Sequence, residues 1–166
     1  MRVLGIDPGT AITGWGVVEQ EFGEQDLILI NYGAIHTPAK MPLPQRLKII
    51  YNDLTELISQ HEPDASAIEV LFFSKNVRTA MSVGHGRGVA MLALVNADLP
   101  IAEYKPVEIK LAIAGYGAAD KQQMQRMVQM LLNLDDIPRP DDAADAIAIA
   151  ICHLHSARMK SLVGNW

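Results

Sequence analysis

Two short apolar runs in this chain each lead directly into an acidic residue. Residues 2–6 precede Asp7, and residues 65–68 precede Glu69. Both runs have the length and composition of strands that are buried on both faces. An ionised carboxylate is too costly to bury without a partner, so these two acids are expected where their strands end, at the edge of a sheet.

A second acidic pair, Asp142 and Asp145, stands at the start of an apolar helical run. Residues three apart share one face of a helix, and the alanines around Asp145 would let that helix lie close to the strands. Four carboxylates gathered in one place repel each other unless divalent cations neutralise them. Asp7, Glu69, Asp142 and Asp145 therefore predict a site for Mg²⁺ or Mn²⁺, as used in phosphodiester hydrolysis.

The periodicity of the chain changes from strands to helices and indicates an α/β fold. Three strands joined by short links favour an antiparallel meander, and the later alternation of strands and helices implies one mixed sheet with helices on both faces. Strands are expected over residues 2–7, 13–19, 27–36, 65–71 and 99–104. Helices are expected over residues 47–61, 74–96, 106–114, from a cap at Asp120 through Leu131, and from 141 to about 158.

The composition fits one domain. With 166 residues, of which 49% are hydrophobic and 20% charged, the chain can bury a core of ordinary size. We expect a single domain over residues 1–158 and a short tail over 159–166. No run resembles a signal peptide or a membrane span, which favours the cytoplasm. Cys152, the only cysteine, is expected to be a buried, inert thiol.

The formal net charge of −5 argues at first against a nucleic-acid partner. Setting the four proposed ligands apart from the 19 acids leaves 15 acids against 14 bases, so the rest of the chain is nearly neutral. The segment from Phe72 to Arg126 is mildly basic, although a mixed, solvated surface would look the same. Net charge alone does not decide whether the partner is DNA.

Each motif also has a structural explanation. Asp7 could simply belong to an Asp-Pro-Gly turn, Glu69 could pair with an arginine, and acids in a first helical turn such as Asp142 are favoured by the helix dipole. Adjacent aromatics in a strand point to opposite faces, so one of Phe72 and Phe73 could fill the core while the other stacks on a base.

Taken together, the motifs resemble the RuvC family of Holliday junction resolvases, bacterial endonucleases with a ribonuclease H-like fold. The resemblance spans residues 2–155 and depends on the order and spacing of several short motifs. These are Leu4-Gly5-Ile6-Asp7-Pro8-Gly9, Thr13-Gly14, Ala67-Ile68-Glu69, Phe72, Lys75-Asn76, Gly84, Arg87-Gly88-Val89-Ala90, Lys110, Gly117, Asp120-Lys121 and Asp142-Ala143-Ala144-Asp145-Ala146.

The resemblance implies a structure-selective, Mg²⁺-dependent endonuclease of DNA recombination and repair. It would nick two strands of like polarity symmetrically in a four-way DNA junction, leaving 5′-phosphate and 3′-hydroxyl ends. The four acids would bind two Mg²⁺ per subunit, with Mn²⁺ as a substitute, and Lys121 would lie near the scissile phosphate. A homodimer and a branch-migration helicase complex are implied as partners, with no membrane. The candidate DNA contacts are Phe72, Phe73, Lys75, Arg78, Lys110 and Lys121.

Two positions depart from the family pattern. Val70 replaces a common glutamine after the strand glutamate, and Gly84-His85-Gly86-Arg87-Gly88 replaces a common Gly-Gln-Ala-Arg-Gly. Neither change touches a proposed metal ligand. Two rival interpretations remain open: a phosphate-binding, ATPase or sugar-kinase-like domain that also begins with Asp-x-Gly-Thr, and a junction-binding scaffold without nuclease activity.

Overall fold

A single five-stranded sheet forms the centre of the molecule. The computed structural model describes residues 1–21, 26–70 and 77–163, excluding the side chains of 77–79 and 161–163. The strands are β1 (Arg2–Asp7), β2 (Ile12–Gln20), β3 (Leu27–His36), β4 (Ala65–Glu69) and β5 (Ile101–Tyr104), in the spatial order β3-β2-β1-β4-β5. β1, β2 and β3 pair antiparallel, whereas β1 pairs parallel with β4 and β4 with β5. The mixed five-stranded sheet expected from the sequence is confirmed.

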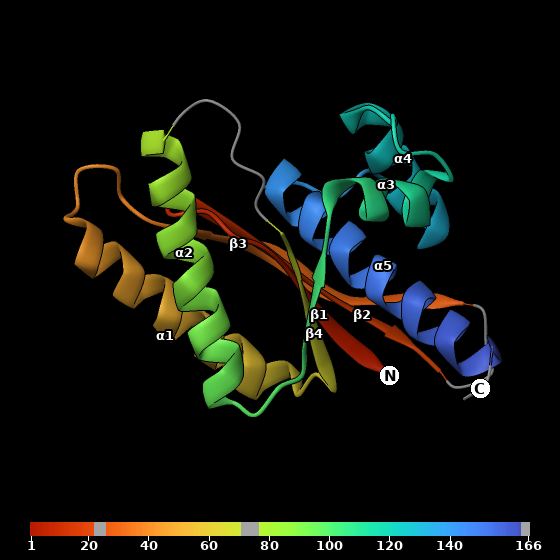
Figure 1. Ribbon diagram of the computed structural model, residues 1–166, viewed down its shortest axis with the longest axis horizontal. Coiled ribbons are helices and arrows are strands. Elements are labelled where there is room, and N and C mark those ends of the chain that lie inside the picture. Colours follow the sequence, from red (N-terminus) through yellow and green to blue (C-terminus); the bar gives the residue numbers. More distant parts are fainter. Residues whose placement is uncertain (22–25, 71–76, 164–166) are drawn as a thin grey trace.

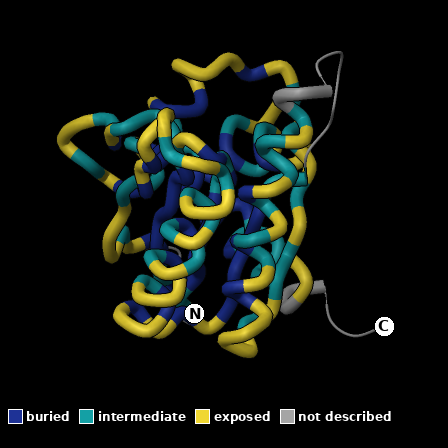
Figure 2. The backbone as a smooth tube through the Cα atoms, turned by 90° about the vertical axis from the view of Figure 1, so that its left-hand side faces the viewer, coloured by how far each residue is buried: buried dark blue, intermediate teal, exposed yellow. Residues whose placement is uncertain are grey.

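Helices cover both faces of this sheet (Figure 1). They are α1 (Leu43–His61), α2 (Val77–Asn96), α3 (Pro106–Ala114), α4 (Lys121–Leu131) and α5 (Asp141–Val163). α1 and α2 lie on one face, and α5 lies on the other with α3 and α4 beside it. The strands and inner helix faces are buried, and the outer helix faces are exposed (Figure 2).

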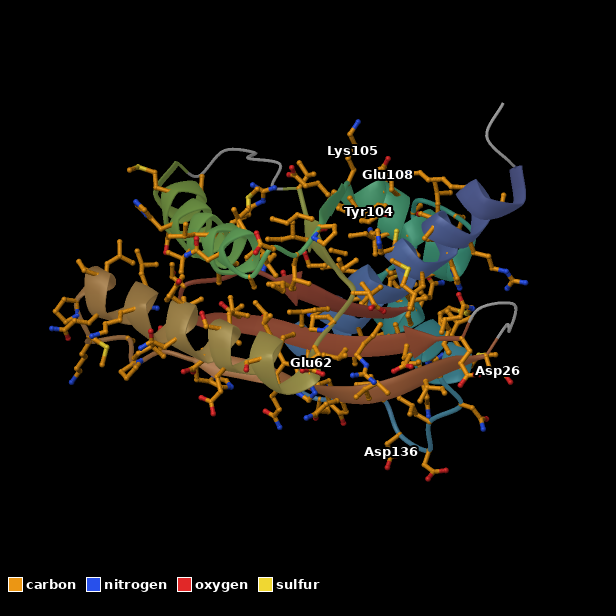
Figure 3. The ribbon with its side chains drawn as sticks, turned by 90° about the horizontal axis from the view of Figure 1, so that it is seen from below. Asp26, Glu62, Tyr104, Lys105, Glu108 and Asp136 are labelled. Carbon is orange, nitrogen blue, oxygen red and sulfur yellow. The ribbon has the colours of Figure 1, made fainter. Side chains whose placement is uncertain are left out.

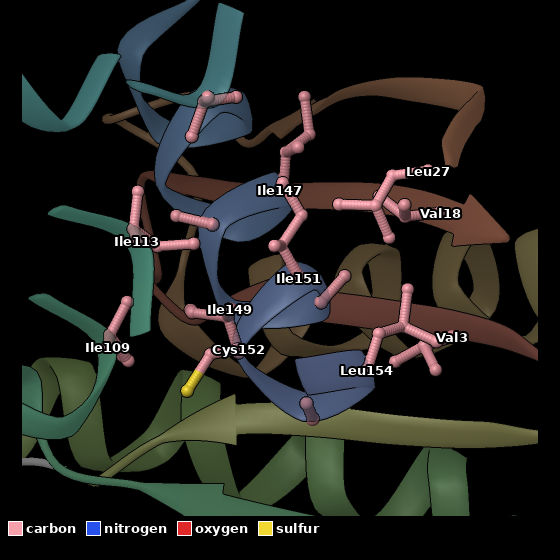
Figure 4. Packing of buried hydrophobic residues seen from close by; sticks show 14 of the residues in the cluster. Val3, Val18, Leu27, Ile109, Ile113, Ile147, Ile149, Ile151, Cys152 and Leu154 are labelled. Carbon is pink, nitrogen blue, oxygen red and sulfur yellow. The ribbon is translucent and has the colours of Figure 1, made fainter. Parts of the chain in front are cut away.

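Alternation along β1 produces the two cores. Leu4 and Ile6 point toward α1 and α2, whereas Val3 packs with Ile147 and Ile151 of α5 (Figure 4). Because successive strand residues point to opposite faces, Asp7 faces α5.

α5 lies unusually close to β1 and β2. A Cβ atom on Gly5 would stand 2.1 Å from the carbonyl oxygen of Ala146, and one on Gly14 would stand 1.9 Å from that of Asp142. No other residue type fits either position without moving the helix backbone. The expectation that this helix approaches the strands closely is confirmed, and glycines on the strands contribute to it as well as the alanines of the helix.

Local signals explain several helix ends. Asp120 accepts a hydrogen bond from the Gln123 N–H at 2.9 Å, and the Gln123 side chain accepts one from the Asp120 N–H, which confirms the predicted cap of α4. At the start of α3, the Lys105 N–H donates to the Glu108 carboxylate at 2.6 Å (Figure 3). α1 ends at His61, and the next residue, Glu62, caps it with a left-handed φ of 43°.

Several boundaries differ from the prediction. β4 ends at Glu69 and not at residue 71, because its last partner on β5 is Tyr104. β5 begins at Ile101 and α1 begins at Leu43, whereas α2 is described from Val77 and the expected helical residues 74–76 lie outside the described residues. α5 continues to Val163, beyond its expected end at about residue 158.

Two further expectations concern single features. Cys152 is buried, and burial raises the pKa of its thiol to about 11, so it is the inert thiol that the sequence indicated. Among the described residues, no helix combines the length and apolar character that crossing a bilayer requires.

Candidate active site

Asp7 and Glu69 lie side by side at the ends of two neighbouring parallel strands. The ladder between β1 and β4 ends with Ile6 opposite Ile68, so both acids follow the last paired residues directly. Ile6 and Ile68 point toward α1 and α2. The alternation therefore directs both carboxylates to the opposite face, where α5 lies.

α5 adds the second acidic pair at its first turn. Asp142 approaches β2 at Gly14, and Asp145 follows one turn further, between the buried Ala144 and Ala146. The two acids distant in sequence are thus held over the ends of the strands by the close packing of α5.

The charges of these acids raise one another's pKa values. Burial, followed by the charges of Asp145, Glu69 and Asp142, raises the pKa of Asp7 from 3.8 to about 7, against the opposing charge of Lys121. Burial, followed by the charge of Asp145, also raises the pKa of Glu69, which Lys110 opposes. Burial is the largest cause for both acids, and the charges of the two lysines do not cancel the upward pKa shifts; a cation placed among the acids would favour their charged forms.

Three of the acids and both lysines line one cleft of about 230 Å³. Its charged lining is Asp7, Glu69, Asp145, Lys110 and Lys121, and its apolar lining is Pro106, Ile109, Met124, Ala148 and Ile149. Asp142 is not part of this lining and acts on Asp7 through its charge. A larger hollow along α1, of about 530 Å³, has Glu56 as its one ionisable acid, so the smaller cleft with its three acids is the candidate active site.

Lys121, the first residue of α4, joins the acidic cluster directly. Its Nζ lies 3.3 Å from Oδ2 of Asp145 and 3.3 Å from Oδ2 of Asp141. Burial lowers the pKa of Lys121, but Asp145 and Asp141 raise it more, so the net shift is upward. Lys121 is therefore a protonated hydrogen-bond donor at the cleft. Asp141 was not among the sequence candidates, since its position suggests only a helix start.

The donor set suits a hard divalent cation, since it consists of carboxylate oxygens in a polar cleft. Within residues 1–21, 26–70 and 77–163, however, no group of three or more His, Cys, Asp or Glu side chains is close enough together to hold a metal ion. Lys121 pairs with Asp145 in this arrangement. The chemistry of the site fits the cation, and binding it would require the side chains to adjust.

The remaining candidates lie at the segment between β4 and α2. Phe72, Phe73 and Lys75 fall outside the described residues. Arg78 is the second residue of α2, and its side chain is also outside the description.

Arg87 contacts the site although sequence reasoning did not select it. Its Nε donates to the carbonyl oxygen of Glu69 at 3.2 Å, and its Nη2 pairs with Glu103. The glycines around Arg87 drew attention to helix packing, and a hydrogen bond to a main-chain carbonyl gives no signal in the sequence.

The sheet order and the acids at its strand ends define a ribonuclease H-like nuclease domain, as expected. The family model described as "Crossover junction endodeoxyribonuclease RuvC" matches residues 3–153. The chain therefore belongs to the RuvC family of crossover junction endodeoxyribonucleases.

Individual relatives agree with this membership. The RuvC protein of Chloroflexus aggregans is 59% identical over 157 residues, which cover 95% of this chain and 94% of the relative. That of Ruminiclostridium cellulolyticum is 52% identical over 165 residues, covering 99% and 98%. The structure of Thermus thermophilus RuvC in complex with Holliday junction substrate matches with a TM-score of 0.90, 36% identity and 96% coverage of both chains. The yeast mitochondrial Holliday junction resolvase Ydc2, at 15% identity and a TM-score of 0.63, shares the fold.

Proposed function

We propose that this protein cuts four-way DNA junctions by nicking two strands of like polarity symmetrically, in recombination and repair. The observation that carries the proposal is one cleft lined by Asp7, Glu69 and Asp145 together with two lysines, in a chain that belongs to the RuvC family over most of its length. The Thermus thermophilus relative is complexed with a Holliday junction substrate, which supports the same substrate here.

Asp7, Glu69, Asp142 and Asp145 would hold two Mg²⁺ ions, with Mn²⁺ as a substitute. The raised pKa values of Asp7, Glu69 and Asp145 support this assignment, because burial first and neighbouring carboxylates second disfavour the charged forms, which a bound cation would favour. When bound, such ions supply an activated water and stabilise charge on the leaving oxygen, so that 5′-phosphate and 3′-hydroxyl ends result.

The lysines of the cleft orient the DNA. Lys121 remains protonated and projects into the cleft from the start of α4, where it can donate to an oxygen of the scissile phosphate once Asp145 turns away from it. Lys110, on α3, lies in the same cleft near Glu69 and would contact the backbone of the strand. Phosphate is thereby bound beside the acids despite their negative charge.

A homodimer is proposed through the outer face of α2. Met81, Leu92 and Val95 are exposed there by 61%, 53% and 58%, and Gly84 and Gly88 on the same helix have open space in front of them. Residues at this spacing form one apolar strip, and small residues let two helices approach. A two-fold axis through this strip would give two sites, as symmetric nicking of two strands requires.

The other contacts extend this proposal. Phe72, Phe73, Lys75 and Arg78 belong to the segment that follows Glu69 and leads into α2, so we assign them to the DNA surface at the same end of the sheet. A branch-migration helicase complex is the proposed partner on the junction, and the cytoplasm, where bacterial DNA lies, is the proposed location.

The deciding experiment compares a synthetic four-way junction with a linear duplex of the same sequence. Protein with Mg²⁺ should nick the junction at symmetric positions in two strands and leave the duplex largely intact. Glu69→Gln should retain junction binding but lose at least about 100-fold in cutting rate, because a ligand disappears while the DNA surface remains. Equal cutting by wild type and this variant would favour a scaffold whose activity comes from a contaminant, and would refute the proposal.

A further inference from the structure

The inner face of α2 contacts the turn that follows Asp7. The hydroxyl groups of Thr10 and Ser82 share a hydrogen bond of 2.5 Å. Gly86 is buried against the same turn, where a Cβ atom would lie 3.0 Å from the carbonyl carbon of Gly9. The backbone of α2 thus lies directly behind the segment that carries the first acid of the cleft.

Arg87, the next residue of α2, reaches the second acid-bearing segment. Its Nε donates to the carbonyl oxygen of Glu69 at 3.2 Å, and its Nη2 forms an ion pair with Glu103 on β5. The ladder between β1 and β4 ends at Ile68, so strand β1 provides no partner for Glu69. Arg87 fills this place at the exact point where β4 ends.

The side-chain carboxylate of Glu69 and the guanidinium that holds its main-chain carbonyl lie on opposite faces of the sheet. Its carboxylate lines the cleft on the α5 side, while α2 packs on the other face of the sheet. The guanidinium of Arg87 therefore holds the main chain of Glu69 from behind. With 19% of its side chain exposed and two partners, Arg87 is well anchored for that task.

We propose that Arg87 is a positioning residue that fixes the Glu69 carboxylate in the cleft through the Glu69 carbonyl group. The proposal rests on the proposed function of Glu69 as a metal ligand. Groups that orient a ligand in this way typically matter by about 10-fold to 100-fold in metal affinity or activity. Because the outer face of α2 carries the apolar strip, the same helix would also connect the dimer contact with the cleft.

The test uses full-length Arg87→Ala and the matched control Glu103→Gln, which removes the charge pair but leaves the bond to Glu69. Calorimetric titration with Mn²⁺ should show affinity at least about tenfold weaker for Arg87→Ala and within about twofold of wild type for the control. Hydrogen exchange in metal-free protein should accelerate in residues 68–70 of Arg87→Ala, where the Val70 N–H otherwise bonds to Tyr104. Junction binding without metal should be unchanged.

Arg87→Lys serves if the alanine variant does not fold, since an ammonium group cannot reach both partners with the geometry of a guanidinium. It should weaken Mn²⁺ binding in the same direction. Wild-type Mn²⁺ affinity and unchanged exchange in residues 68–70 would overturn the proposal, and so would an equal loss in Glu103→Gln. The exchange measurement needs neither metal nor DNA, so it separates this proposal from the proposed function, which fails if wild type does not cut junctions.

Discussion

Replacing Asp7 by Asn should stabilise the metal-free protein while it destroys cutting. Burial and the charges of Asp145, Glu69 and Asp142 raise the pKa of Asp7 to about 7 from 3.8. A pKa difference of one unit between the folded and unfolded states corresponds to about 1.4 kcal/mol. Above pH 7 the ionised carboxylate therefore lowers the free energy of unfolding by up to about 4 kcal/mol. Asn keeps the shape and loses that charge.

The sign follows from proton binding. Between pH 4 and pH 7 the folded chain keeps a proton on Asp7 that the unfolded chain has released, so the stability of wild type falls as the pH rises through this window. Asp7→Asn lacks this dependence. Its advantage should therefore grow by about 2 to 3 kcal/mol between pH 5 and pH 8.

Thermal unfolding in EDTA at several pH values is the assay. A gain of about 4 kcal/mol at pH 8 corresponds to a Tm higher by roughly 8 to 16 °C for a chain of this size. Asp136→Asn, at an exposed acid away from the cleft (Figure 3), is the control and should leave Tm nearly unchanged. Mg²⁺ should stabilise wild type more than Asp7→Asn. The reasoning is refuted if Asp7→Asn is no more stable than wild type at pH 8, or if its advantage is the same at pH 5.

Three further substitutions test other parts of the site. Lys121→Ala should slow cutting at saturating junction by about 100-fold, because a donor to the phosphate is lost, and a defect in affinity alone would contradict this. Gly14→Ala should lower the free energy of unfolding by about 3 kcal/mol or more and remove most of the activity, because the new methyl group collides with the carbonyl oxygen of Asp142. A chemical denaturation curve that matches wild type would show instead that α5 can move away from β2. Phe72→Ala should cut junctions at least about fivefold more slowly, through lost base stacking, while its Tm stays within about 2 °C of wild type, and a large fall in Tm would mark Phe72 as part of the core.

Much of the fold could be read from local patterns. The strand from residue 2 to Asp7 and the helix from Pro106 to Ala114 have their predicted bounds, because apolar period, proline and glycine act over a few residues. The less accurate bound at the end of β4 depends on where the neighbouring strands stop pairing. The point at which a neighbouring strand stops pairing cannot be inferred from the residues of the segment itself.

The cleft shows the same division. Asp7 and Glu69 stood out because an ionised carboxylate next to a buried strand is costly unless it has a partner. Lys121 was recognised only through the family resemblance, and its pairing with Asp141 and Asp145 required α4 and α5 to be placed. Arg87 was missed as a site residue because its partner is a main-chain carbonyl, which carries no mark in the sequence.

The amino-acid order by itself determined which residues carry charge at element ends, the periods of the strands and helices, and the membership of a nuclease family. Only the tertiary structure decided how closely α5 approaches Gly14, which acids share a cleft with the two lysines, and what holds Glu69 from behind. The physical reason is that these interactions act over different distances along the chain. Periodicity and capping act between residues near in sequence, whereas burial and Coulomb interactions depend on distances in space that close packing alone sets.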